Sequence, residues 1–184
     1  MLTSRFDEAF AYARDLHNDQ RRKQTDIPYV SHLMCVSGLV LENGGNEDQA
    51  IAALLHDAAE DCGGLETLAI IRDRFGEAVA QIVADCTDSY DDEKGPWKPR
   101  KMAYLEKLPK KAKASLLVSL ADKTHNSEAI YGDWLTIGDD IWNRFSAPRE
   151  ETLWYYRSLA NVFLSAYPGA LANRLDRTVK ALGA

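Results

Sequence analysis

Apolar residues recur every three to four positions along most of the chain, which is typical of amphipathic helices. This period, together with the glycines and prolines that interrupt it, predicts helices at residues 3–18, 28–41, 47–61, 65–75, 77–87, 101–108, 111–131, 141–145, 148–166 and 168–182. No stretch has the strict alternation of a half-buried strand. The pattern predicts an all-α fold, a bundle of about nine to ten helices in a single domain over residues 1–184.

Two segments between these helices are predicted to be loops. Residues 88–99 are polar, rich in acids and end in a region with two prolines, so we interpret them as a mobile loop near a functional site. Residues 132–140 are predicted to connect two helices.

The most informative stretch is Leu54-Leu55-His56-Asp57-Ala58-Ala59-Glu60-Asp61. Read as helix, it places His56, Asp57, Glu60 and Asp61 on one broad face. Three carboxylates beside an imidazole would repel each other unless a cation lay among them. The spacing therefore predicts a divalent metal site with two spare carboxylates, Glu60 and Asp61, that can activate water.

Two further residues can complete this site. His32 lies in a predicted helix, and Asp122 follows an apolar run, where a buried carboxylate needs a partner or a metal. Together with His56 and Asp57 they give two imidazoles and two carboxylates. That set suits Mn²⁺, Fe²⁺ or Zn²⁺ better than Ca²⁺, and the lack of thiolates argues against structural zinc. His17 and His125 are interpreted as packed histidines, with a supporting role beside the ligands as the alternative.

Composition and charge narrow the class of protein. The chain is 46% apolar and 27% charged, as in soluble globular proteins, and has no apolar run long enough for a bilayer. A net charge of −6 disfavours nucleic-acid binding. Three cysteines without a paired motif, and an acidic N-terminus without a signal peptide, predict a cytoplasmic protein without a membrane anchor. Two basic clusters, at 21–23 and 94–113, could receive a polyanionic small molecule.

Taken in order, the motifs resemble a known family. They are residues 17–23 with 28–32, Leu54-Leu55-His56-Asp57 with Glu60-Asp61, Phe75-Gly76, Thr87-Asp88 and residues 120–126. The chain is similar to the HD metal-dependent phosphohydrolases, and among them to the alarmone hydrolases related to the hydrolase half of the Rel/Spo proteins. The resemblance is close over about residues 2–131. Because the chain has no room for a nucleotide-synthesising domain, it resembles the small stand-alone forms.

The resemblance implies a reaction and its residues. Family members remove the 3′-pyrophosphate from guanosine 3′-pyrophosphate 5′-di- or triphosphate, usually with Mn²⁺. The implied metal ligands are His32, His56, Asp57 and Asp122. The implied catalytic acid pair is Glu60 and Asp61. The implied substrate-binding residues are Arg22, Lys23, Lys98, Lys123 and Asn126. Lys98 is our choice of phosphate ligand in the loop after Thr87-Asp88, with Arg100 and Lys101 as alternatives.

Two departures from the family pattern leave details open. The segment Gln24-Thr25-Asp26-Ile27 lacks the family's glycine, so either Arg22 or Lys23 could lie against the base. In the C-terminal part, Arg149 and an aromatic residue from 154–156 could close the pocket, although core packing is the commoner role for such aromatics.

Alternative functions and the oligomeric state also stay open. One alternative is an HD phosphohydrolase acting on another nucleotide or on a phosphorylated dinucleotide cofactor. Another is a non-catalytic nucleotide-binding or toxin-neutralising protein. The expected partner is a small guanine nucleotide, and association into homo-oligomers is left open.

Overall fold

The computed structural model describes residues 1–90 and 95–183. Over these residues the chain forms ten α-helices, two 3-10 helices and no strand, so the predicted all-α fold is confirmed. In chain order the elements are α1 (Ser4–Leu16), α2 (Val30–Glu42), α3 (Glu47–Leu55), α4 (Ala58–Asp61), α5 (Gly64–Phe75), α6 (Glu77–Cys86), α7 (Trp97–Lys107), η1 (Leu108–Lys110), α8 (Lys113–Ile137), η2 (Gly138–Arg144), α9 (Arg149–Ala166) and α10 (Ala170–Ala181).

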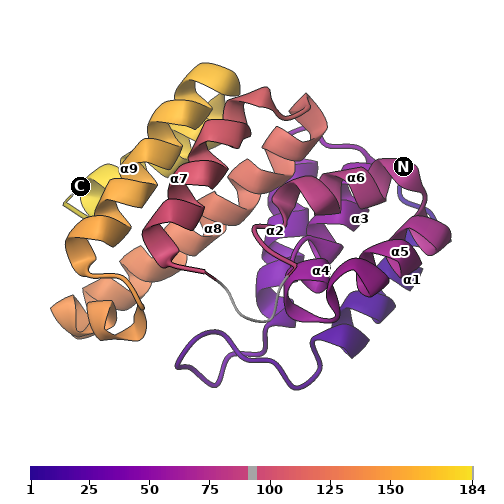
Figure 1. The fold of residues 1–184 in the computed structure, drawn as a ribbon, viewed down its shortest axis with the longest axis horizontal. Helices are drawn as coiled ribbons and strands as arrows, with labels where there is room; N and C mark the ends of the chain where they lie inside the picture. The colour runs from indigo at the N-terminus through magenta and orange to yellow at the C-terminus, as the bar shows by residue number, and fades with distance from the viewer. Residues whose placement is uncertain (91–94, 184) are drawn as a thin grey trace.

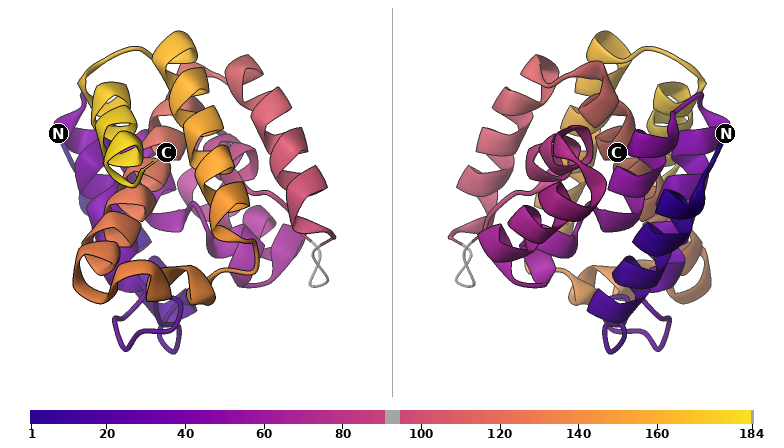
Figure 2. Two further views of the ribbon diagram at one scale, coloured as in Figure 1. Left: turned by 90° about the vertical axis from the view of Figure 1, so that its left-hand side faces the viewer. Right: turned by 90° about the vertical axis from the view of Figure 1, so that its right-hand side faces the viewer.

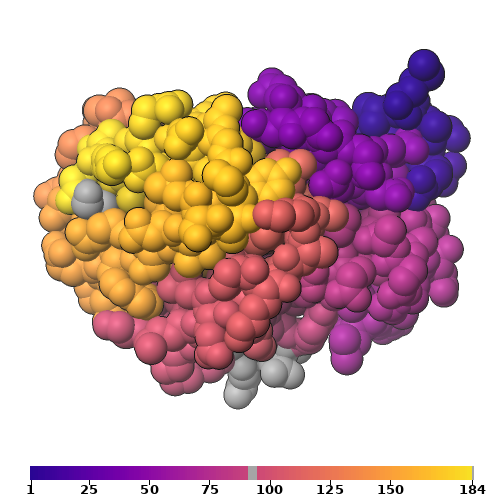
Figure 3. All heavy atoms as spheres, turned by 90° about the horizontal axis from the view of Figure 1, so that it is seen from above, coloured from indigo at the N-terminus to yellow at the C-terminus, as the bar shows by residue number. Residues whose placement is uncertain are grey.

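The long helix α8 lies at the centre of the fold (Figure 1). It packs against α2, α3 and α6 and also against α9, α10 and η2, so it joins the two ends of the chain. Figure 2 shows α10, α9 and α7 as neighbouring helices, and Figure 3 shows the N-terminal and C-terminal helices at opposite ends of the molecule. Among the described helices, none combines the length and apolar character needed to cross a membrane.

The buried core runs through these contacts. Val36, Leu55, Val83, Leu120 and Leu159, one each from α2, α3, α6, α8 and α9, are all fully buried. Burying one such side chain stabilises the fold by roughly 1.5–3 kcal/mol relative to leaving it in water. The functional residues described below therefore project from helices whose opposite faces are fixed in a dry core.

Local signals in the sequence explain where several helices begin and end. Asn46 accepts a hydrogen bond from the backbone N–H of Gln49 at 3.0 Å, while the Gln49 side chain accepts one from the backbone N–H of Asn46 at 3.0 Å. This reciprocal pair caps α3. Gly76, with φ of 91°, separates α5 from α6, a conformation that side chains larger than hydrogen disfavour.

One predicted helix is interrupted at the most informative residues. Residues 47–61 form α3 and α4, and His56 and Asp57 lie in the turn between them. Asp57 has φ −98° and ψ −6°, in the sparsely populated bridge region. In a regular helix, neighbouring side chains diverge by about 100°. The interruption lets these two consecutive side chains approach the same point.

Two other helix boundaries differ from the predicted ones. Helix α7 begins at Trp97 and includes Pro99 in its first turn, where a helix needs no backbone N–H donor. Helix α8 continues through Gly132 to Ile137, so most of the loop predicted at 132–140 is helical. It ends at Gly138, whose φ of 61° favours glycine. Part of the loop predicted at 88–99 lies outside the described residues.

The segment between α1 and α2 is a short hairpin-like loop. The Arg22 backbone N–H donates to Ile27 at 2.8 Å, and the Tyr29 N–H donates to Gln20 at 3.0 Å. Gln24 takes φ of 54°, a left-handed conformation that costs a side-chain-bearing residue about 1–2 kcal/mol. Gln24 therefore supplies the turn for which the family pattern uses glycine.

Candidate active site

The four predicted metal ligands converge from three parts of the fold. His32 lies in the first turn of α2, His56 and Asp57 lie between α3 and α4, and Asp122 lies in α8. The Nε2 atom of His56 is 2.9 Å from Asp57 Oδ2 and 3.6 Å from Asp122 Oδ1. The Nε2 atom of His32 is 3.7 Å and 3.3 Å from the same two oxygens. Ligand atoms of His32, His56 and Asp57 all lie within 4.8 Å of one another.

The hydrogen bonding of the two histidines fits a metal ion. Both rings are buried, and the Nε2 atom of each has no hydrogen-bond partner in the described part of the chain. His56 Nδ1 donates to the Ala53 carbonyl at 2.8 Å, which fixes a proton on Nδ1 and directs Nε2 toward the carboxylates of Asp57 and Asp122. An unpartnered buried nitrogen is costly, and coordination of a cation would remove that cost.

The charges around this centre favour a cation. Burial opposes a positive charge on His56, but the carboxylates of Asp57 and Asp122 outweigh it and raise the pKa of His56 well above its usual value. Burial likewise opposes ionisation of Asp122, yet the adjacent Lys123 ammonium holds its pKa well below the usual range. The pKa of Asp57 is also held well below its usual value, against burial, chiefly by His56, so both carboxylates carry the negative charge that a metal ion would require.

Two neighbouring residues orient the ligands. The Tyr29 hydroxyl donates to Asp57 Oδ2 at 2.6 Å, and burial, followed by the Asp57 charge, raises the pKa of Tyr29, so it stays protonated as a donor. His125 Nδ1 lies 2.8 Å from His32 Nδ1. Burial, followed by the His32 charge, lowers the pKa of His125 to about 4. For His125, this contact favours the supporting role that the sequence offered as an alternative.

The two spare carboxylates follow the ligands by one turn of α4. The backbone N–H of Asp61 donates to the Asp57 carbonyl at 2.9 Å, which ties the acid pair to the metal centre. Glu60 Oε2 accepts from the backbone N–H of Asp88 at 2.9 Å. Asp61 Oδ2 accepts from Gln20 Nε2 at 2.9 Å, so the loop before α2 also supports this pair.

A cavity of about 580 Å³ opens beside the metal ligands. Arg22, Lys23 and Asn126 line it, together with Tyr29 and His125. Arg22 Nη2 donates to Asn126 Oδ1 at 2.7 Å, and Asn126 Nδ2 donates to the ligand Asp122 at 2.5 Å. This volume is large enough for a nucleoside.

A second cavity, of about 230 Å³, is more strongly cationic. Lys23, Lys101 and Lys123 line it, and Lys23 and Asn126 also line the larger cavity. The two cavities therefore adjoin. Tyr156 lines both, and Tyr155 lines the smaller one, so two of the three C-terminal aromatic candidates reach the site.

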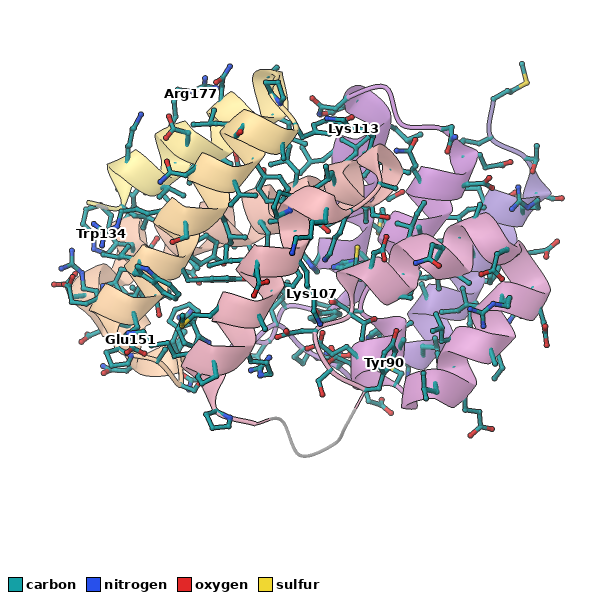
Figure 4. The ribbon with its side chains drawn as sticks, turned by 45° about the horizontal axis from the view of Figure 1, so that its top comes forward. Tyr90, Lys107, Lys113, Trp134, Glu151 and Arg177 are labelled. Carbon is teal, nitrogen blue, oxygen red and sulfur yellow. The ribbon has the colours of Figure 1, made fainter. Side chains whose placement is uncertain are left out.

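Lys98 lies apart from both cavities. Its Nζ pairs with Glu151 at 3.0 Å, and half of its side chain is exposed. Glu151 is labelled near the edge of the molecule in Figure 4. Of the two alternatives, Lys101 lines the smaller cavity, and Arg100 and Lys101 both pair with Asp88. Lys94, the first residue of the basic run, lies outside the described residues.

A family comparison agrees with this geometry. The model of the HD domain family matches residues 9–153, which include the four candidate ligands and the candidate acid pair, Glu60 and Asp61. The chain belongs to the HD domain family. An HD domain implies a divalent metal, and His32, His56 and Asp57 form a possible metal-binding group.

Several relatives of this HD domain are named after one reaction. A guanosine-3′,5′-bis(diphosphate) 3′-pyrophosphohydrolase of Xenopus tropicalis is 38% identical over 122 residues, 65% of each chain. The bifunctional (p)ppGpp synthase/hydrolase SpoT of Escherichia coli is 30% identical over 132 residues, 68% of this chain and 18% of SpoT. The chain thus spans less than two thirds of the length of either relative.

A solved structure resembles the HD domain over almost its full length. A metazoan ortholog of SpoT, described as hydrolysing ppGpp, matches with a TM-score of 0.80 at 25% identity, covering 98% of this chain and 96% of the other. A Listeria monocytogenes protein matches with a TM-score of 0.70 at 27% identity, covering 81% and 96%.

Reasoning from the sequence gave no role to three residues that the structure places at the site. The Tyr29 hydroxyl bonds the candidate ligand Asp57, and the Gln20 side chain bonds Asp61. Asp88 bonds Glu60 through its backbone N–H and Lys101 of α7 through its carboxylate. All three belong to motifs that carried the family resemblance. Their roles depend on contacts across the fold, which the spacing of residues within one segment does not reveal.

Proposed function

We propose that residues 1–184 form one HD-type phosphohydrolase domain that hydrolyses the 3′-pyrophosphate of guanosine 3′,5′-bis(diphosphate) or the corresponding 5′-triphosphate. The products are GDP or GTP and pyrophosphate. The observation that supports the proposal is a buried pair of Nε2 atoms that face two carboxylates without hydrogen bonding to them, beside Glu60, Asp61 and two adjoining cationic cavities. The names of the relatives and of the similar solved structure support this substrate.

His32, His56, Asp57 and Asp122 would hold the metal ion. When bound, a divalent ion supplies Lewis acidity toward the phosphoryl group and lowers the pKa of water. Manganese is the ion we propose, because an N/O donor set without thiolate suits it and the resemblance described from the sequence implies it. Fe²⁺ and Zn²⁺ are the competing ions, and metal analysis of the purified protein distinguishes them.

Glu60 and Asp61 would act on the attacking water. One carboxylate orients the water and accepts its proton, and the proton then passes to the leaving 3′-oxygen of the ribose. The new bond joins the water oxygen to the phosphorus next to the ribose, and the bond that breaks joins that phosphorus to the 3′-oxygen. The tie between Glu60 and the Asp88 backbone limits how far this carboxylate can turn.

The remaining site residues would bind the nucleotide. Arg22, Lys23 and Asn126 would contact guanosine in the larger cavity, with Arg22 or Lys23 against the base. Lys123, together with Lys101 in the smaller cavity, would offset phosphate charge through charge-assisted hydrogen bonds. Lys98 stays a predicted phosphate ligand, but its pairing with Glu151 favours Lys101 for that role.

A substrate panel tests the proposal. Manganese-loaded protein is expected to release pyrophosphate from guanosine 3′,5′-bis(diphosphate) but not from GDP or GTP, which lack the 3′-group. Faster hydrolysis of another nucleotide or of a phosphorylated dinucleotide would replace the substrate and keep the enzyme class. Inactivity toward all of them, with metal bound, would favour a non-catalytic nucleotide-binding or toxin-neutralising protein.

The cytoplasmic location and the absence of nucleic-acid partners stay predictions. Whether the chain forms homo-oligomers stays an open question. Cell fractionation, a nucleic-acid binding assay and light scattering measure them separately.

A further inference from the structure

A third cavity, of about 620 Å³, lies between the end of α6, the residues that follow it, α7, η1 and the two residues before α8. Four cationic residues line it: Arg100, Lys107, Lys110 and Lys111. None of its lining residues lines either cavity of the active site. Figure 4 labels two residues near it, Tyr90 and Lys107.

Tyr104 separates this cavity from the active site. Its ring centroid lies 4.1 Å from Lys111 Nζ, which belongs to the third cavity, and 5.3 Å from Lys123 Nζ, which belongs to the catalytic side. Only 6% of Tyr104 is exposed. On this side a packed aromatic ring would therefore keep a molecule in the third cavity apart from the metal centre. On another side the cavity comes closer, because Asp88 lines it and also bonds Glu60 through its backbone N–H.

The acids that line the cavity already have partners. Asp85 accepts hydrogen bonds from Ser115 at 2.5 Å and from Gln81 at 3.0 Å. Asp88 accepts hydrogen bonds from Arg100 and from Lys101, the latter at 2.8 Å. Asp88 is thus paired with Arg100 and Lys101, and the four cations that line the cavity outnumber its two acids.

Two lysines of the cavity keep their charge largely uncompensated. Lys107 makes no ion pair with any residue in the described ranges. Lys110 is 3.6 Å from Glu106, but both side chains are more than 70% exposed, and such pairs stabilise little. An anion entering the cavity would meet them without displacing a strong protein contact.

Deeper cationic groups add to this attraction. Lys111 is partly buried and donates to the Asp85 carbonyl, and burial lowers its pKa. The Nε atom of Arg100 is buried without a hydrogen-bond partner among the described residues. Cations removed from water interact more strongly with an anion than exposed ones do.

We propose that this third cavity binds a small anion carrying two or more phosphate groups, at a site separate from the metal centre. Its volume is that of a small-molecule site and not of an extended protein or nucleic-acid surface. Four cations from three segments match several phosphate oxygens, and guanidinium and ammonium groups are common phosphate ligands. This proposal does not depend on the identity of the hydrolysed nucleotide.

Equilibrium dialysis with radiolabelled inorganic triphosphate tests it. The protein is kept loaded by holding Mn²⁺ in excess over triphosphate. The variant Lys107→Gln/Lys110→Gln removes two exposed charges of the cavity, and the matched control Lys113→Gln/Lys180→Gln removes two lysines outside it. The cavity variant is expected to lose one bound equivalent, or to bind it about tenfold more weakly. The control is expected to stay within about twofold of the original protein.

Three results would overturn the proposal. One is unchanged binding in the cavity variant, and another is an equal loss in both variants, which would indicate general charge attraction. The third is equally tight binding of citrate to the same site, which would contradict the preference for phosphate. Pyrophosphate release measured in parallel bears on the proposed function alone, because binding is counted whether or not turnover occurs.

Discussion

The metal ligands and the substrate-binding cations are held in different ways. His32 lies in α2 and His56 in the turn after α3, and both are fully buried, with Nε2 facing two carboxylates but without a hydrogen-bond partner among the described residues. By contrast, Arg22 and Lys101, on the loop before α2 and near the start of α7, already bond Asn126 and Asp88. The metal centre is thus preorganised for a cation, whereas the substrate must replace contacts within the protein. Changes at the centre should abolish function, and changes at the cavities should weaken it by degrees.

Replacement of a metal ligand should have the largest effect. His56→Gln keeps the volume of the side chain but removes an imidazole whose Nε2 faces both carboxylates. We expect the protein to be purified without metal and hydrolysis to fall by on the order of 10³-fold or more. Elemental analysis and pyrophosphate release measure the two effects. A folded variant with a full metal content would contradict the ligand assignment.

The acid pair should separate catalysis from metal binding. Glu60→Gln/Asp61→Asn is expected to lower hydrolysis by about 10²–10⁴-fold, because proton transfer is lost, while the metal content is kept. The matched control is Glu66→Gln/Asp73→Asn, which neutralises two exposed acids on α5. Normal turnover by the first variant would rule out the role proposed for the pair.

Tyr29→Phe should give an intermediate effect, since it deletes only the hydroxyl that bonds Asp57. Removing such a partner of a ligand typically costs about 10–100-fold in metal affinity or activity. Titration of the metal-free protein with Mn²⁺ measures the affinity. Tyr12→Phe, in a partly buried tyrosine of α1, is the control and should leave the affinity unchanged.

The two α7 lysines should differ in their effect on substrate binding. Lys101→Gln removes a cation from the smaller cavity, and we expect KM to rise about tenfold. Lys98→Gln breaks a half-exposed pair with Glu151, so KM should change by less than about twofold. Equal effects, or a larger one for Lys98, would restore the prediction made from the sequence.

The smallest effect concerns stability at low pH. Burial would raise the pKa of Asp88, but Lys101 and Arg100 outweigh it and hold the pKa below the reference value of 3.8. This pair therefore stabilises the fold above pH 3.8, and the contribution is lost as the pH falls through the lower folded value. Asp88→Asn should lower the free energy of unfolding by about 1 kcal/mol at pH 7 and flatten its decline below pH 4. Urea unfolding across this range measures both effects, and an unaltered pH profile would show that Asp88 is not the group responsible.

The convergence of His32, His56, Asp57 and Asp122 was predictable because residue type and spacing agree there. Adjacent His56 and Asp57 behind two leucines, and Asp122 after an apolar run, are hard to explain without a shared cation. The break between α3 and α4 was not predictable from the spacing of apolar residues. The turn forms at His56 and Asp57, whose side chains approach the same point. Tertiary contacts outweighed local helix propensity at these residues.

The cavities were less predictable because sequence distance says little about which lysine points inward. Lys98 and Lys101 are three residues apart on α7, yet one pairs with Glu151 on the surface and the other lines the smaller cavity. Likewise, Gln24 adopts the conformation for which a glycine was expected. In both cases the deciding information is a contact or a backbone angle, which residue type alone does not supply.

The contact between the two histidine Nδ1 atoms has a further consequence for ligand recognition. Coordination of a cation through His32 Nε2 requires the His32 proton to be on Nδ1, which then donates to His125 Nδ1. His125 must therefore carry its own proton on Nε2. His125 lines the larger cavity, so a nucleotide bound there, as proposed, would lie beside an imidazole whose tautomer is fixed. Binding of a metal would thus select one tautomer of His125, although His125 is not itself a candidate ligand. Metal occupancy and the hydrogen-bond preference of the larger cavity would then be linked.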